Sequence, residues 1–267
     1  MGRDSAWNRG SRFCAQESTQ RDSQMTDQRI SVILPAYRAA PLVAEAIQRI
    51  RDDVQPADVE IIVVDDGSED ETALIARQSG ANQVIELTEN RGKGEAVRRG
   101  MAAASGSYLV FTDVDLAYRP SQIMSIVEVL EGGADVALGS RRHSDSEENG
   151  PPSLMREQGS RVFNRLTRLF LPGPHLDTQC GLKGFTFQAA QSIFPMSRID
   201  GFAFDVEVLF LSRRFEMEIV EIPVVVDHVE QSTVRFIPQA IRMLWDVARV
   251  RLWSMTRRYN DAPPTGG

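Results

Sequence analysis

The feature that most restricts the fold of this chain is a regular alternation of short β-branched runs and amphipathic segments from residue 30 onward. The runs are apolar on both faces, as buried parallel strands are, and the segments between them repeat apolar residues at helical spacing. This β-α-β-α order predicts an α/β fold with a mostly parallel central sheet and helices on both of its faces. The expected strands are 30–34, 60–64, 83–87, 108–112, 135–138, 185–187 and 219–226. The expected helices are 41–52, 70–79, 93–105, 121–131, 154–171, 205–214 and 236–258.

The segments outside this alternation define the expected domain organisation. Residues 1–28 are polar without a hydrophobic period, which predicts a disordered tail. We expect one domain over 29–235, an amphipathic helix over 236–258 and a second tail over 259–267. Residues 142–153 interrupt the alternation with polar residues, glycine and proline, so we expect a loop there.

Composition excludes several classes of protein. The chain is 42% apolar and 25% charged, which fits a soluble domain with a real core. No apolar run approaches the about 20 residues that a spanning helix needs. A net charge of −7 argues against general nucleic-acid binding. The two cysteines, Cys14 and Cys180, fit a reducing compartment, and we therefore expect a cytoplasmic protein.

Polar and aromatic residues follow three of the expected strands. In an open parallel sheet, ligands bind beyond the carboxyl ends of the strands. The residues that follow these three strands should therefore meet at one crevice. They are Pro35, Ala36, Tyr37, Asp65, Asp66, Asp113 and Asp115.

Asp113 and Asp115 are the sharpest signal among these residues. Successive strand residues point to opposite faces, so an Asp-x-Asp spacing is expected to place both carboxylates on one side. Paired oxygen ligands without His or Cys suit Mg²⁺ or Mn²⁺. The plainer alternative is that these aspartates, like the Asp-Asp-Gly-Ser segment over 65–68, are turn and helix-cap residues.

A glycine-rich turn, Asn-Arg-Gly-Lys-Gly over 90–94, precedes the expected helix 93–105. Such a turn would present backbone N–H groups, a helix N-terminus and the Lys93 ammonium to a phosphate. It matches neither the dinucleotide fingerprint nor the P-loop. Lys93 gains weight because Lys93 and Lys183 are the only lysines in the chain.

Together these motifs resemble glycosyltransferase family 2, whose members are inverting enzymes of the GT-A nucleotide-sugar-binding fold. The resemblance covers about 29–235, and the segments 30–37, 63–68 and 113–115 carry it in the family's order and spacing. Further segments resemble the dolichyl-phosphate β-glucosyltransferase and polyprenyl-phosphate mannose synthase branches, the glucosyl branch more. These segments are 90–94, 139–141, 177–183 and 201–207.

The resemblance implies a role for each residue that matches the family's motifs. The nucleotide-sugar donor, UDP-glucose or GDP-mannose, would be bound by Pro35, Ala36, Tyr37, Asp65, Asp66, Lys93 and Asp113. A metal, Mg²⁺ or Mn²⁺, would be held by Asp113 and Asp115. The acceptor phosphate would be bound by Ser140, Arg141 and Arg156, and the catalytic residues would be Asp113, Asp115 and Arg141.

Two departures from the family's pattern weaken the expected donor and metal contacts. The first motif usually continues with Asn-Glu, and this chain has Arg38-Ala39 there. A third metal ligand found in some mannose synthases is replaced by Ala117.

The expected reaction moves a hexose, with glucose favoured, from the nucleotide sugar to polyprenyl or dolichyl phosphate. A phosphate monoester is mostly a dianion at neutral pH, because its second pKa is about 6. Such a nucleophile needs no general base. We therefore assign no catalytic-base role to Asp205 or Glu207, and Glu207 is expected either to hold an arginine or to be an ordinary helix-start carboxylate.

The acceptor is the least constrained part of this expectation. The helix 236–258 carries several arginines with Trp245 and Trp253, which suits peripheral binding at the cytoplasmic face of a membrane, although an ordinary packing helix is the alternative. A soluble acceptor with the same donor chemistry is one alternative function. A catalytically silent nucleotide-sugar-binding protein is another, and no nucleic-acid partner is expected.

Overall fold

The structure is a computed structural model, and it describes residues 29–55, 58–149, 177–178, 180–227, 236–256 and 259. The expected tail 1–28, the expected helix 154–171 and Arg156 within it lie outside the described residues. The same holds for the expected second tail except residue 259. The domain boundaries therefore stay predictions.

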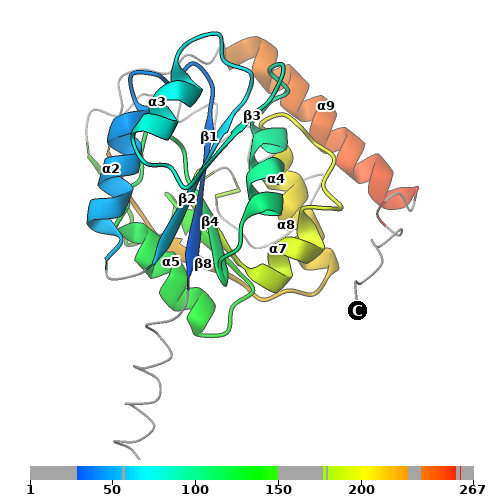
Figure 1. The fold of residues 1–267 in the computed structure, drawn as a ribbon. Helices are drawn as coiled ribbons and strands as arrows, with labels where there is room; N and C mark the ends of the chain where they lie inside the picture. The colour runs from blue at the N-terminus through cyan, green and yellow to red at the C-terminus, as the bar shows by residue number, and fades with distance from the viewer. Residues whose placement is uncertain are drawn as a thin grey trace, which may run out of the picture.

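The centre of the described part is a sheet of seven strands. They are β1 (Ile30–Ala36), β2 (Val59–Asp65), β3 (Gln83–Glu86), β4 (Tyr108–Phe111), β5 (Val136–Ser140), β7 (Lys183–Thr186) and β8 (Ile219–Pro223). Their order in space is β3-β2-β1-β4-β7-β5-β8 (Figure 1). Only β7 runs antiparallel to its neighbours β4 and β5. The mostly parallel sheet predicted from the sequence is therefore confirmed.

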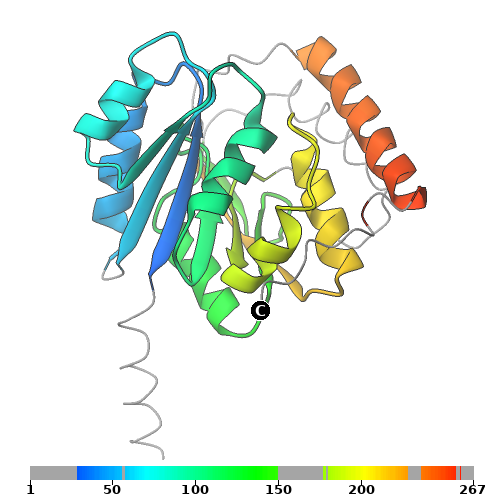
Figure 2. The same cartoon turned by 45° about the vertical axis from the view of Figure 1, so that its right-hand side comes forward.

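Helices cover both faces of this sheet, as predicted (Figures 1 and 2). One face carries α2 (Val43–Asp53), α3 (Thr72–Gln78) and α5 (Gln122–Glu131). The other carries α4 (Lys93–Ala103), α7 (Phe187–Ile193) and α8 (Phe204–Arg214). The last helix, α9 (Phe236–Met255), packs against α8 on this second face.

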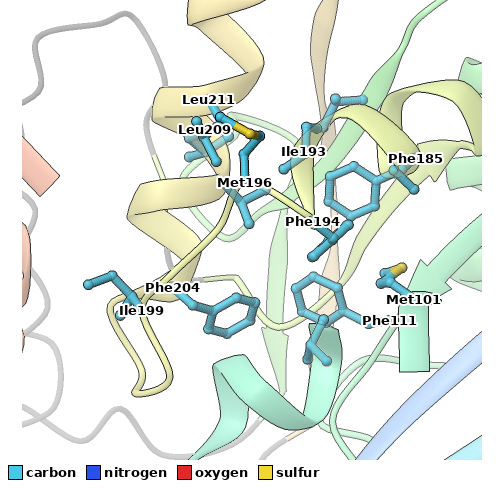
Figure 3. Close-up of a cluster of buried hydrophobic side chains, with 14 of the residues drawn as sticks. Met101, Phe111, Phe185, Ile193, Phe194, Met196, Ile199, Phe204, Leu209 and Leu211 are labelled. Carbon is cyan, nitrogen blue, oxygen red and sulfur yellow. The ribbon is translucent and has the colours of Figure 1, made fainter. Parts of the chain in front are cut away.

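The core consists of one apolar cluster on each face of the sheet. Alternate residues of β1 belong to different clusters. Val32 and Leu34 lie in the first cluster, on the face with α2, α3 and α5, and Ile33 lies in the second, on the face with α4, α7 and α8. In the second cluster Phe111 lies between the sheet and α8, with its ring centroid 5.5 Å from that of Phe204 (Figure 3). Burying a side chain of this size contributes about 1.5–3 kcal/mol, so these contacts hold α8 firmly against the end of β4.

The expected strand 219–226 is wrong as a single element, because it is two strands in two sheets. After β8, the chain leaves the main sheet at Pro223 and forms β9 (Val225–Asp227). This strand pairs in parallel with β6 (Glu147–Asn149), so the expected loop 142–153 also contains a strand in its described part. Proline has no N–H to continue a ladder, which is a physical reason for a strand to end there.

The sequence prediction also missed a helix directly after β7. Thr186 begins it as an N-cap, since its hydroxyl accepts the Ala189 N–H at 3.2 Å. The expected strand 185–187 is in fact 183–186, and α7 follows without a linker. At the expected helix 70–79, Asp70 lies before α3 and its carboxylate accepts the Thr72 N–H at 3.2 Å.

Across the described residues, we find no helix whose length and hydropathy would let it cross a bilayer.

Candidate active site

The carboxyl ends of β2, β1 and β4 lie side by side at one edge of the sheet (Figure 1). Three sets of predicted site residues lie at or just beyond the ends of these strands. Tyr37 is 44% exposed beyond β1, whereas Asp65 and Asp66 at the end of β2 are buried. Pro35 and Ala36 lie within β1, and Ala36 is buried in register with Asp65. The structure thus gathers these residues at one edge, while their roles stay predictions.

Asp66 joins the end of β2 to the glycine-rich turn. Its carboxylate accepts the backbone N–H groups of Arg91 and Gly92, each at 2.8 Å. Burial, together with the charges of Asp65 and Glu95, raises the pKa of Asp66 more than these two hydrogen bonds lower it. A Cβ atom on Gly67 would lie 2.3 Å from the backbone of Glu89, so only glycine lets the two turns pack this closely.

The glycine-rich turn does not have the free N–H groups that the sequence suggested for a phosphate. Besides Arg91 and Gly92, the N–H groups of Gly94 and Glu95 both point to the Asp200 carbonyl oxygen, at 2.7 and 3.3 Å. The expected phosphate cradle is therefore wrong for these four N–H groups. What the turn supplies to the site is the Lys93 side chain.

Lys93 forms an ion pair with Asp113. Its Nζ lies 2.5 Å from Asp113 Oδ1, and the two side chains are 14% and 33% exposed. Burial lowers the pKa of Lys93, but the carboxylates of Asp113, Asp205 and Asp115 outweigh this and raise it. The ring centroids of Phe111 and Phe204 lie 5.8 and 6.0 Å from the ammonium group. Lys93 is therefore a fixed, fully charged cation at the strand edge.

Asp113 and Asp115 come together for a different reason from the one predicted. β4 ends at Phe111, and the two aspartates lie in the following turn, where the Leu116 N–H donates to the Asp113 carbonyl oxygen at 3.0 Å. Asp115 Oδ1 accepts the Ala117 N–H at 3.2 Å. The carboxylates both act on Lys93, so strand alternation is the wrong explanation and a turn brings them together.

The donor set at Asp113 and Asp115 fits a divalent cation that also binds phosphate. Both side chains offer hard carboxylate oxygens, the ligands that Mg²⁺ and Mn²⁺ prefer. A Cβ atom on Gly181 would lie 2.2 Å from Asp113 Oδ2, so the glycine leaves room beside this oxygen. Within the described residues no group of three His, Cys, Asp or Glu could hold a metal. Water and donor phosphates would therefore have to complete the coordination.

A second ion pair lies beneath the first. Lys183 Nζ is 2.6 Å from Asp205 Oδ1, and the exposed fractions of the two side chains are 0% and 6%. Lys183 also donates to the Cys180 carbonyl oxygen, and its ammonium lies 5.4 Å from the Phe111 ring centroid. Burial, with the charge of Asp113, raises the pKa of Asp205 more than Lys183 and Lys93 lower it. Sequence reasoning assigned Lys183 no role, although its being one of two lysines was the signal.

Arg141 follows β5 and is clamped by Asp177. Its Nε and Nη2 donate to the two carboxylate oxygens at 2.6 and 2.9 Å, and its backbone N–H donates at 3.2 Å. Ser140, next to it, is buried, and its hydroxyl has no hydrogen bond within the described part of the chain. Asp177 lies in the segment 177–183, which carries part of the family resemblance, but its contact with Arg141 was not predicted.

One aromatic residue connects Arg141 to the Asp113 turn. Tyr118 is buried and interacts electrostatically with Arg141 and Asp177. A Cβ atom on Gly181 would be 3.3 Å from the Tyr118 ring and 2.2 Å from Asp113. Gly181 and Tyr118 therefore link the predicted donor residue Asp113 to the predicted acceptor residue Arg141.

Glu207 has a structural arrangement of hydrogen bonds. Its Oε2 accepts the N–H groups of Arg198 and Ile199 at 2.8 and 2.7 Å, and its Oε1 accepts the Tyr259 hydroxyl at 2.6 Å. Burial raises the pKa of Glu207 more than these bonds lower it. The carboxylate holds a loop and Tyr259 against α8, and the expected arginine contact is made through the Arg198 backbone.

The unusual Arg38-Ala39 pair is bound to the turn after β2. The Arg38 N–H donates to Ser68 Oγ at 2.8 Å, and its guanidinium pairs with Glu69 at 2.8 Å. Ala39 is buried, and its N–H donates to Thr72 Oγ1 at 2.9 Å. These residues close the turn, and Ala39 offers no side-chain polar group to a donor.

Two solved structures of one enzyme align with nearly the whole chain. Glucosyl-3-phosphoglycerate synthase from Mycobacterium tuberculosis in complex with UDP aligns with a TM-score of 0.65 and 23% identity, over 100% of this chain and 89% of that one. The same enzyme with Mn²⁺, UDP-glucose and phosphoglyceric acid aligns with a TM-score of 0.63 and 22% identity, over 99% and 88% of the two chains. The chain has the GT-A glycosyltransferase fold, which confirms the predicted fold class.

Sequence comparison adds the family. The model for glycosyl transferase family 2 matches residues 31–194. A dolichyl-phosphate β-glucosyltransferase from Dictyostelium discoideum is 33% identical in an alignment of 242 residues that covers 83% of this chain and 73% of the relative. The human protein of that name is 32% identical over 250 residues, 85% of this chain and 76% of the relative. The chain therefore belongs to glycosyl transferase family 2, as its motifs predicted.

Proposed function

We propose that this protein transfers glucose from UDP-glucose to a dolichyl or other polyprenyl phosphate and inverts the anomeric centre. The observation that carries the proposal is that the Asp113–Lys93 pair and the Asp177-clamped Arg141 follow strands of the same sheet and are linked through Tyr118. One cluster suits a diphosphate with its metal, and the other suits a second phosphate. The relatives named as dolichyl-phosphate β-glucosyltransferases, which this chain matches over most of their length, support glucose and the lipid phosphate.

The donor side is assigned to the first strand ends and the Asp113 turn. Asp113 and Asp115 would hold Mg²⁺ or Mn²⁺, which when bound supplies Lewis-acid neutralisation of the donor diphosphate. Lys93 adds a second positive charge at the same place and is anchored by its aromatic neighbours. Tyr37, exposed beyond β1, is available to contact the nucleoside.

The acceptor side is assigned to Arg141, with Ser140 beside it. A guanidinium matches the oxygens of a phosphate, and Asp177 fixes its orientation before the acceptor arrives. The acceptor phosphate is already ionised and attacks without a general base. Both carboxylates of α8 are buried and bonded to protein groups, in keeping with a reaction that does not use them as bases. Arg156 would join this side and lies outside the described residues.

A lipid acceptor places the reaction at a membrane surface, and the two cysteines, which suit a reducing compartment, favour its cytoplasmic face. A soluble phosphorylated acceptor is the competing possibility. Arg141 recognises a phosphate and makes no distinction between a lipid and a metabolite.

The test is glucose transfer by the purified chain with Mn²⁺ or Mg²⁺. Radiolabelled UDP-glucose and GDP-mannose are compared as donors, and a short polyprenyl phosphate and 3-phosphoglycerate are compared as acceptors. We expect a labelled lipid product from UDP-glucose, lost in Asp115→Asn. Labelling of 3-phosphoglycerate alone would replace the lipid acceptor by a soluble one. Nucleotide-sugar binding without any product would favour a silent binding protein.

A further inference from the structure

The outer face of α9 combines apolar exposure with positive charge. Trp245, Leu252 and Met255 are 70%, 57% and 70% exposed. At about 3.6 residues per turn, these three side chains fall within an arc of about 80°. Val247, Val250 and Trp253 are at most 8% exposed on the opposite side, where the helix joins the core. The apolar strip is therefore separate from the face that packs against the protein.

Arginines flank this strip on both sides. Arg242 and Arg249 are exposed along one border and Arg251 is exposed along the other. The nearby acidic residue Asp246 is half-buried and pairs with Arg249 at 3.1 Å. This face is basic in a chain whose net charge is −7, so it differs from the average surface in sign. Its charge is complementary to an anionic surface.

The position of α9 connects this face to the candidate active site. α9 begins at the end of the molecule where β1, β2 and β4 finish (Figures 1 and 2). A Cβ atom on Gly201 would lie 3.5 Å from Asp246, and the neighbouring Asp200 carbonyl oxygen accepts N–H groups at the start of α4, next to Lys93. A flat surface against α9 would therefore lie beside the strand edge.

We propose that the outer face of α9 binds the surface of an anionic phospholipid bilayer. Trp245, Leu252 and Met255 enter the head-group region, and the three arginines contact anionic lipid phosphates. An aromatic and apolar strip between arginines is the pattern of a helix that lies in the interface plane. Binding of this face to a bilayer does not itself depend on the proposed function. Its purpose, which is to hold the enzyme near lipid phosphates, rests on that function.

The experiment is sedimentation of the full chain with vesicles that contain no polyprenyl phosphate. Vesicles of phosphatidylcholine with a minor fraction of phosphatidylserine are compared with phosphatidylcholine alone. We expect binding to the mixed vesicles that weakens as salt is raised. The triple variant Trp245→Ser, Leu252→Ser, Met255→Ser should bind about 100-fold more weakly. The substitutions Arg242→Gln and Arg251→Gln should each weaken binding about 5-fold, because each removes one positive charge.

Leu74→Ser on α3 is the matched control, because Leu74 is 47% exposed on the opposite side of the sheet. It should bind vesicles as the unmodified chain does. Trp245 gives a second readout, since brominated lipids should quench fluorescence that is absent in Trp245→Phe. Equal vesicle binding by the triple variant would overturn the inference. So would a self-association that the triple variant abolishes without any vesicle binding, because the face would then bind a second copy.

The outcomes separate this inference from the proposed function. The triple variant should keep full transfer to a short acceptor presented in detergent, because its residues lie outside the transfer site. Vesicle binding without transfer would remove the proposed reaction and leave the surface assignment intact. Transfer in detergent without vesicle binding would support the proposed reaction and overturn the surface assignment.

Discussion

The two lysines of this chain occupy neighbouring places that differ mainly in their access to water. Each ammonium lies against the Phe111 ring and pairs with one aspartate, at 2.5 Å for Lys93–Asp113 and 2.6 Å for Lys183–Asp205. In the outer pair the side chains are 14% and 33% exposed, whereas in the inner pair they are 0% and 6% exposed.

This difference in exposure gives the two ion pairs different roles. The outer pair can exchange its partner for a phosphate or a metal that arrives from solvent, because both groups reach the surface. The inner pair has no such access, and its loss would leave a buried charge without compensation. The outer lysine–aspartate pair is therefore part of a candidate site, and the inner pair is a structural connection between β7 and α8.

Removing the inner cation should cause the largest change. Lys183→Met leaves the Asp205 carboxylate buried beside apolar rings, and we expect a loss of about 3–5 kcal/mol in the free energy of unfolding. Guanidinium unfolding followed by circular dichroism measures it. The double variant Lys183→Met, Asp205→Leu should recover most of the loss, since both charges are then gone. A loss below about 1 kcal/mol in the single variant would show that water reaches this pair and would erase the comparison.

Removing the outer cation should reverse this pattern. In Lys93→Met we expect kcat/KM for glucose transfer to fall about 10²–10³-fold, because one preorganised charge on the leaving diphosphate is lost. The free energy of unfolding should change less than in Lys183→Met, by about 1 kcal/mol, since this pair is partly exposed to solvent. Steady-state kinetics and unfolding of the same preparation test both parts. A variant that unfolds easily but transfers normally when folded would make Lys93 another structural lysine.

The sequence singled out both lysines but could not show that their roles differ. They are the only lysines in the chain, and the glycine-rich turn predicted a phosphate-binding role for Lys93 alone. The structural role of Lys183 follows from its contact with Asp205. This contact exists because β7 enters the sheet between β4 and β5 in the antiparallel direction. No local pattern encodes that insertion, because it depends on packing between distant segments.

The regular half of the fold was easier to predict than the irregular half. β1, β2 and β4 are largely apolar on both faces, so their burial could be inferred from local periodicity. The switch from β8 to β9 at Pro223 and the helix α7 were missed, since short strands and helices of about two turns carry weak periodic signals. The Asp113–Asp115 pairing was expected for a strand and is produced by a turn.

A third, partly open ion pair gives the comparison an intermediate case. The Asp177 carboxylate is buried while the Arg141 side chain is 27% exposed. Burial raises the pKa of Asp177, but the hydrogen bonds and charge of Arg141 outweigh it and the net pKa is lowered. A carboxyl with a lowered folded pKa stabilises the fold above its unfolded pKa of about 3.9, and this contribution is lost as pH falls through the folded pKa.

Arg141→Met should therefore lose about 2 kcal/mol of stability near neutral pH, where Asp177 is left charged and buried. Without the arginine, burial should place the pKa of Asp177 above its unfolded value, so this variant should regain stability as pH falls toward about 4. The difference between the two proteins should shrink on acidification, and unfolding curves at several pH values measure it. A difference that stays constant with pH would mean that the loss comes from packing and not from the charge.

The smallest expected effect sharpens the idea that the outer pair is exchangeable. If Lys93 and a divalent ion compete for Asp113, then Lys93→Met should bind Mn²⁺ about 5-fold more tightly in the absence of nucleotide. This factor corresponds to about 1 kcal/mol for unit charges a few ångströms apart in water-like surroundings. Electron paramagnetic resonance of free Mn²⁺ gives the affinity, and Asp115→Asn should weaken it in either background. An unchanged or weaker affinity in Lys93→Met would show that the ammonium holds Asp113 in place for the metal, because removing a mere competitor can only strengthen binding.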